Sequence, residues 1–225
     1  MLFACTSLRL PEPCLYRTNF SLHSNSRLPS IPDNDLNANP RGIAIRFKLA
    51  EHVHTDIIAH STPEFPAKTG QEFLEFLHAI AASDPSKAST SPTPIEKFIS
   101  THPAAAAFVK PLPAPSSFAR EAYFGITALC FTNKDGASRF GRYRIMPEGG
   151  IEHLDDANAK SKDGNYLFDD LARRISGGPI SFQILVQVAN ETDIVANATI
   201  HWPRRPSDCR SRQNYSDCGC ALQRA

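Results

Sequence analysis

The sequence predicts a mixed α+β domain in which an antiparallel sheet is interrupted by helices. Three observations carry this prediction: apolar residues alternate over 180–188, a hairpin pattern covers 127–145, and apolar residues follow Thr69 at helical spacing. A period of two places one face of a strand in the core, whereas spacings of three and four place one face of a helix there. The 225 residues suffice for one domain with a sizeable core.

The N-terminal part begins without a clear pattern. Residues 1–27 have neither helical nor strand periodicity, so we expect an unpatterned N-terminal arm. Turn-forming residues fill 31–42. A strand is predicted over 43–49, followed by a short apolar piece at 56–59; the strand's apolar face is Ile43, Ile45, Phe47 and Leu49.

The middle of the chain predicts helices. Thr69 and Glu72 form a capping-box pattern, which predicts a helix over 70–82. Thr93 supplies the N-cap of a second short helix, with proline at the first helical position and glutamate at the third. An alanine run restarts the helix at 104.

Strands return in the second half. Residues 127–132 and 138–145 flank a turn at Asn133–Gly136, which predicts a hairpin. A helix near 166–175 ends at two glycines and leads into the strand at 180–188. Residues 204–225 mix Arg, Ser, Asp and Cys without an apolar face, so we expect an unpatterned tail.

Charge and composition exclude several classes of partner. The 24 basic and 23 acidic residues leave a net charge of +1, which predicts neither a nucleic-acid partner nor binding to an anionic membrane. No apolar run is long enough for a membrane helix, and the first residues lack the pattern of a signal peptide. We therefore expect a soluble, intracellular protein, cytoplasmic or peroxisomal. The spacing of the tail cysteines matches no common zinc pattern, so no metal site is predicted.

Several short segments resemble the catalase superfamily in order and spacing. They are Asn39–Phe47 (NPRGIAIRF), Asp56–Pro63 (DIIAHSTP), Ser117–Phe118, Phe131–Gly136 (FTNKDG) and Arg142–Tyr143. The catalase-related haem peroxidase branch shares further segments: Glu72–Leu77 (EFLEFL), Pro92–Glu96 (PTPIE), Arg139–Arg144 (RFGRYR) and His153–Asp156 (HLDD). The resemblance covers residues 28–203 and implies a partial catalase core domain there.

The resemblance also implies a fold. It predicts a partial antiparallel β-barrel with helices inserted between the fourth and fifth strands. Residues 42–49 correspond to the fourth strand, the hairpin to the fifth and sixth, and 180–189 to the seventh. We expect the first two strands, most of the third, and the eighth to be missing.

The resemblance implies four site residues. His60 stands where catalases place an asparagine that hydrogen-bonds peroxide, and an imidazole can donate in the same way, which makes it the catalytic candidate. A histidine bonded to a loop carbonyl is the alternative. Phe65 and Phe73 correspond to aromatic residues that pack around the haem b cofactor, although core packing explains them equally well. Arg41 lies near a position where the family has an arginine, which makes it a cofactor-binding candidate.

Two residues of the family's chemistry have no match. The distal histidine and the proximal tyrosinate correspond to nothing here, since His23 and Tyr215 have different surroundings. The implied function is haem-dependent decomposition of hydrogen peroxide or organic peroxides, impaired in this chain. The alternatives are a non-catalytic remnant that does not hold haem productively and a small-ligand binding module. The sequence leaves the natural peroxide and the oligomeric state open.

Overall fold

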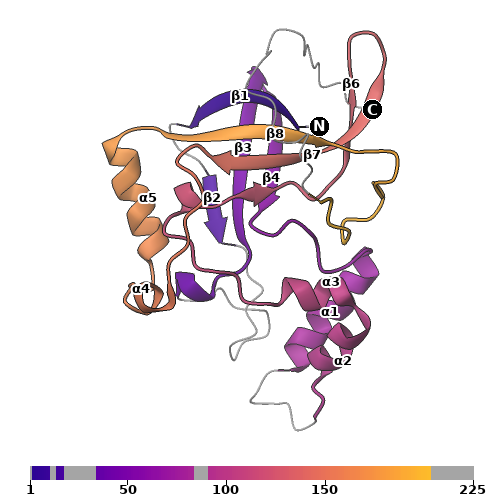
Figure 1. The fold of residues 1–225 in the computed structure, drawn as a ribbon, viewed down its shortest axis with the longest axis vertical. Helices are drawn as coiled ribbons and strands as arrows, with labels where there is room; N and C mark the ends of the chain where they lie inside the picture. Colours follow the sequence, from indigo (N-terminus) through magenta and orange to yellow (C-terminus); the bar gives the residue numbers. More distant parts are fainter. Residues whose placement is uncertain (1, 11–13, 18–33, 84–90, 204–225) are drawn as a thin grey trace.

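One antiparallel sheet organises the molecule (Figure 1). The computed structural model describes residues 2–10, 14–17, 34–83 and 91–203, with side chains from residue 34 onward except 48–50. The order of its strands is β1-β8-β7-β5-β4-β3-β2, and β6 pairs with β7 outside this path. The strands are β1 (Leu2–Leu10), β2 (Cys14–Arg17), β3 (Arg41–Ala50), β4 (Val53–His60), β5 (Tyr123–Phe124), β6 (Leu129–Thr132), β7 (Ser138–Pro147) and β8 (Ile180–Val188).

The strand predictions from the sequence are confirmed. Segments 42–49, 127–133, 138–145 and 180–189 contribute β3, β6, β7 and β8 to the same sheet. The turn at Asn133 forms as expected, because its side-chain oxygen accepts from the amides of Asp135 and Ala137 at 3.0 and 2.8 Å. The structure therefore has the predicted α+β class.

The barrel prediction is not supported. A barrel requires the two end strands of the sheet to pair with each other. Among the described strands, β1 pairs only with β8 and β2 only with β3, so the sheet stays open.

The N-terminal part expected to be an unpatterned arm, residues 1–27, contains two strands. Residues 2–10 and 14–17 form β1 and β2, and these two strands stand where the resemblance predicted only part of one. Neither segment shows apolar alternation, and each owes its extended conformation to hydrogen bonds with a neighbouring strand. The expected tail at 204–225, with Tyr215, and the segment around His23 lie outside the described residues.

Three helices form a module of their own at one end of the molecule, away from α5 (Figure 1). They are α1 (Gly70–Ala82), α2 (Pro94–Thr101) and α3 (Pro103–Phe108), as the sequence predicted. Thr93 and Glu96 form the expected capping box. The module has a separate apolar cluster, made of Phe76, Ile80, Ile95, Ala105 and Phe108. No helix in the described part of the chain is long and apolar enough to span a membrane.

The main core lies on one face of the sheet. Helix α5 (Tyr166–Gly177) packs there, together with the short helix η2 (Phe118–Arg120). Two other short helices, η1 (Asp35–Asn37) and α4 (Asp156–Lys160), belong to the connections. The sheet contributes Ile43, Ile45, Ile57, Ala59, Tyr123, Ile145, Ile180, Phe182 and Ile184 to this core. We call this the inner face and the opposite side the outer face.

Candidate functional site

His60 lies on the outer face at the end of β4. It pairs with Gly42 of β3 and with Phe124 of β5, and Phe124 in turn pairs with Arg144 of β7. Directly paired residues of antiparallel strands project to the same side. His60, Phe124 and Arg144 therefore form one row across three strands, and the Arg144 guanidinium lies 5.2 Å from the centre of the Phe124 ring.

The environment of His60 sets its protonation state. The residue is half-buried, and this burial lowers the pKa of its imidazole below the usual 6.5. The imidazole is therefore mainly neutral at neutral pH. A neutral imidazole offers one N–H donor and one acceptor nitrogen, which are the groups needed to hydrogen-bond a small oxygen ligand.

Residues 194–203, which we call the strap, are held against the outer face near this row. Arg142, on β7, is fully buried and donates to the carbonyls of Ile200 and Asn197 at 2.7 and 3.0 Å. Its guanidinium lies 4.3 Å from the ring centre of Trp202, the largest fully buried side chain among the described residues. The Trp202 indole N–H donates to the carbonyl of Ile194 at 3.1 Å. These contacts make the strap part of the outer face although it contains no helix or strand.

The strap also meets the loop that follows His60. The amide of Phe65 donates to the carbonyl of Ala198 at 3.0 Å. The Nδ1 of His201 lies 3.6 Å from a carboxylate oxygen of Glu64. Burial lowers the pKa of His201, Glu64 opposes this effect, and Arg144 adds to it. His201 is therefore close enough to interact electrostatically with Arg144, which belongs to the row of His60.

Phe65 and Phe73 lie close to each other in the structure. Their ring centres are 4.9 Å apart, and Phe65 also lies 6.4 Å from Phe108 of α3. Both rings therefore contact the helical module, where Phe73 packs against the cluster of Phe76. The role of these two rings beside His60 stays a prediction.

Arg41 lies on the other side of the sheet from His60. It precedes Gly42, the partner of His60, and successive residues of a strand project to opposite faces. The Arg41 guanidinium is fully buried, lies 3.8 Å from the Glu121 carboxylate and donates to Asn39 Oδ1 at 3.0 Å. These internal contacts assign Arg41 to a buried charge network of the core rather than to a shared pocket with His60.

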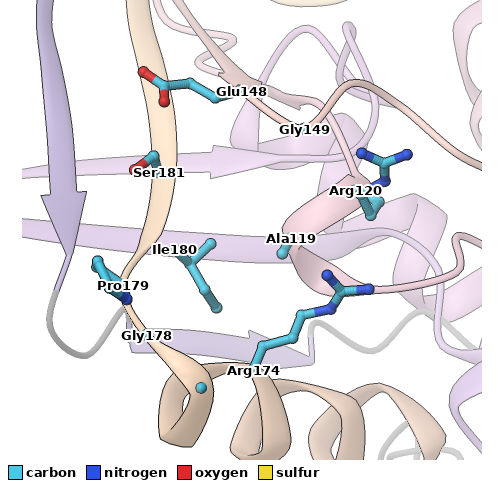
Figure 2. Close-up of a pocket in the computed structure, with 10 residues that line it drawn as sticks. Ala119, Arg120, Glu148, Gly149, Arg174, Gly178, Pro179, Ile180 and Ser181 are labelled. Atoms are coloured by element: carbon cyan, nitrogen blue, oxygen red, sulfur yellow. The ribbon is translucent and has the colours of Figure 1, made fainter.

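One groove on the surface is lined by residues other than those of the outer-face row. Figure 2 shows a groove that Arg120 reaches from η2 and Arg174 from α5. Arg120 lies 3.5 Å from the Glu152 carboxylate, and Arg174 donates to Asp170 at 2.7 Å, so each guanidinium is balanced by a carboxylate. None of the four site residues predicted from the sequence lines this groove. Among the described residues, no group of three or more His, Cys, Asp or Glu side chains could hold a metal ion.

Comparison with known proteins decides the family. The Catalase family model matches residues 18–202. The chain belongs to the catalase family. Two curated relatives of the chain are named catalase-related peroxidases. That of Mycolicibacterium paratuberculosis is 30% identical over 166 residues, which cover 72% of this chain and 51% of the relative. That of Synechococcus elongatus is 29% identical over 178 residues, which cover 78% and 52%.

Solved catalase structures share the fold of the chain. A fungal catalase superposes with a TM-score of 0.63 at 23% identity, covering 76% of this chain and 37% of that protein. Catalase A of Saccharomyces cerevisiae gives 0.60 at 21% identity, covering 76% and 38%. The chain thus spans about half the length of the curated relatives and less of the solved structures. The resemblance to the catalase-related peroxidase branch is confirmed.

Two buried tyrosines of the chain do not fit a haem held by a tyrosinate. The Tyr123 and Tyr166 hydroxyls donate to the carbonyls of Phe118 and Pro115, both at 2.9 Å. Burial raises the pKa of Tyr123 well above 10 and that of Tyr166 to about 12, so both stay neutral phenols. Tyr143 packs its ring edgewise against Phe131, with ring centres 5.6 Å apart. Tyr123 and Tyr166 thus supply no phenolate ligand.

Sequence reasoning missed several residues of the outer face. Arg144 joins the row of His60, and His201 lies beside Glu64, only because β7 and the strap come together on the outer face. The alternation of Arg142 and Arg144 in β7 signalled two cations on one side of a strand. No local pattern signalled that residues 194–203 would cover them.

Proposed function

We propose that the outer face of this chain carries the peroxide-binding part of a catalase-related peroxidase site. Family membership supports peroxide decomposition as the general chemistry. The observation that carries the proposal is the row of His60, Phe124 and Arg144, which puts a half-buried neutral imidazole on a face separate from the core. The substrate would be hydrogen peroxide or an organic hydroperoxide.

His60 would act as a hydrogen-bonding group. Its neutral imidazole can donate one N–H to a peroxide oxygen and accept from the peroxide O–H with its other nitrogen. Phe65 and Phe73 would form the apolar wall beside it. We keep Arg41 out of this pocket because its guanidinium lies on the inner face beside Glu121.

Haem b is the cofactor that the family resemblance implies, and when bound it would supply the redox chemistry. The neutral phenols of Tyr123 and Tyr166 do not offer the ligand that this cofactor takes in the family. We therefore propose the core domain of 28–203 as the bearer of the peroxide-facing residues, and we expect impaired turnover.

The test is peroxide turnover by the purified chain after titration with haem. We expect a rate lower by on the order of a hundredfold to ten-thousandfold than that of a full-length catalase-related peroxidase, as loss of a general acid and base typically costs. Oxygen release and dye oxidation would both be measured in the soluble monomeric fraction. His60→Ala should remove the residual rate, whereas His78→Ala, an exposed histidine of α1, should not.

Two outcomes would contradict the proposal. A rate equal to that of the full-length relative would show that the chain is not impaired. A residual rate that His60→Ala leaves unchanged would remove His60 from the site.

A non-catalytic remnant is the second candidate function. The commitment of the Tyr123 and Tyr166 hydroxyls to backbone carbonyls favours it, because neither can become a ligand without breaking a buried hydrogen bond. A haem titration that produces no Soret shift would support this reading. A saturable shift with one haem per chain would count against it.

A further inference from the structure

We propose that Arg142 is a positioning residue of the outer-face site, because it clamps the strap against β7 and the strap in turn fixes the loop after His60. Neither the family comparison nor the sequence pattern assigns such a role. The role rests on the proposed function only in taking His60 as the peroxide-facing group.

The clamp begins with the geometry of the guanidinium. Arg142 reaches two strap carbonyls from one side chain, at 2.7 Å for Ile200 and 3.0 Å for Asn197, while its face covers Trp202. A planar guanidinium has donors in a fixed fork and a face that stacks on aromatic rings, so these contacts fix orientation as well as position. Lysine would keep the charge but lose the fork.

The strap is shaped to meet this clamp. Asn197 Oδ1 accepts from the Thr199 amide at 3.0 Å and from the Thr199 hydroxyl at 2.8 Å, which closes a turn. The turn lies between the two carbonyls that Arg142 holds. Its backbone is therefore fixed on both sides of Ala198 by one buried side chain.

The fixed carbonyl of Ala198 passes the constraint to the loop after β4. It accepts from the Phe65 amide at 3.0 Å, and the His201–Glu64 pair joins the same two segments at 3.6 Å. Ser61, at the start of the loop, is held separately, since its amide donates to the carbonyl of Arg41 at 2.8 Å within the sheet. The two loop amides thus report on different anchors, Phe65 on the strap and Ser61 on the sheet.

The experiment is residue-resolved amide hydrogen exchange in Arg142→Ala. We expect exchange of the Phe65 amide to accelerate about tenfold relative to the Ser61 amide, as the loss of one local hydrogen bond typically produces. Arg142→Lys should restore part of the protection because a cation can still cover Trp202 and reach one carbonyl. Arg46→Ala is the matched control, since it removes an exposed arginine paired with Asp56 and should leave the ratio unchanged.

A second readout separates positioning from general stability. In Arg142→Ala the NMR-measured pKa of His60 should rise toward 6.5 as the loop becomes more hydrated. Equal acceleration at Phe65 and Ser61, with an unchanged His60 pKa, would reduce Arg142 to a general stabiliser and overturn the proposal. If Arg142→Ala does not fold, Arg142→Lys and Trp202→Phe decide between the same two outcomes.

The proposed function can fail independently. Selective exchange at Phe65, combined with a peroxide rate that does not depend on His60, would keep the clamp and remove the catalytic assignment. Equal acceleration of exchange at Phe65 and Ser61, combined with a peroxide rate that depends on His60, would remove the clamp and keep the catalytic assignment.

Discussion

Two buried arginines on opposite faces of the same sheet are compensated in different ways. Arg41, on the inner face, lies beside the Glu121 carboxylate, whereas Arg142, on the outer face, is surrounded by the carbonyls of the strap and the ring of Trp202. A buried charge pair is sensitive to the loss of either partner, because the charge that remains is buried without compensation. A charge satisfied by backbone carbonyls instead fixes the path of a segment without regular structure. We therefore expect substitutions of the inner-face pair to change mainly the stability of the protein. Substitutions of the outer-face contacts should change mainly the geometry of the candidate site.

The largest expected effect is on the inner face. Arg41→Ala removes the buried guanidinium beside the Glu121 carboxylate and leaves only the exposed His153 imidazole near it, at 3.8 Å. This change should lower the free energy of unfolding by about 3–5 kcal/mol. Arg46→Ala removes an exposed arginine at the same sheet and should cost less than about 1 kcal/mol. Urea denaturation of both variants measures the difference. Equal costs would show that the buried pair adds nothing to the inner face.

A smaller effect compares apolar residues of the two faces. Ile145 is fully buried on the inner face, whereas Ile58 is 58% exposed on the outer face. Ile145→Val should lower the free energy of unfolding by about 0.5–1.5 kcal/mol. Ile58→Val should stay within about 0.5 kcal/mol of the parent, since it removes little buried surface. Chemical denaturation of both variants measures these two changes. A larger loss of stability for Ile58→Val than for Ile145→Val would show that the faces are wrongly assigned.

The smallest expected effects concern the dependence of the unfolding free energy on pH. The contributions of His60 and Glu121 to this free energy should change with pH in opposite directions. The pKa of His60 is lowered from 6.5 by burial, so its contribution to stability is present above pH 6.5 and is lost as pH falls through the folded-state pKa. The pKa of Glu121 is raised from 4.5, mainly by burial and against the opposing effect of Arg41. Its contribution is present below pH 4.5 and is lost as pH rises through the folded-state pKa.

Unfolding free energies measured between about pH 4 and about pH 8 would separate these two contributions. His60→Gln should reduce the decrease in unfolding free energy that occurs as the pH falls. Glu121→Gln should reduce the decrease that occurs as the pH rises. Slopes are the relevant quantity, because Glu121→Gln also removes the partner of Arg41. If both variants keep the pH slope of the parent protein's unfolding free energy, groups other than His60 and Glu121 cause that slope.

The sequence alone determined the elements whose signal is local. Apolar alternation identified β8, the Asn133 turn identified the β6–β7 hairpin, and the Thr69 and Thr93 caps identified α1 and α2. Order and spacing of short segments also identified the catalase family. Each of these signals depends on residues within one helix, strand or turn, or on the order of short segments along the chain. One amino-acid sequence is therefore enough to detect them.

Only the tertiary structure decided which face each candidate occupies. The register between β3 and β4 separates Arg41 from His60, and no local pattern encodes that pairing. The strands β1 and β2 likewise form in segments without alternation, because the hydrogen bonds that define them come from β8 and β3. The strap has no periodicity at all. It contributes His201 to the outer face because Arg142 and Trp202, 60 positions apart, meet in space.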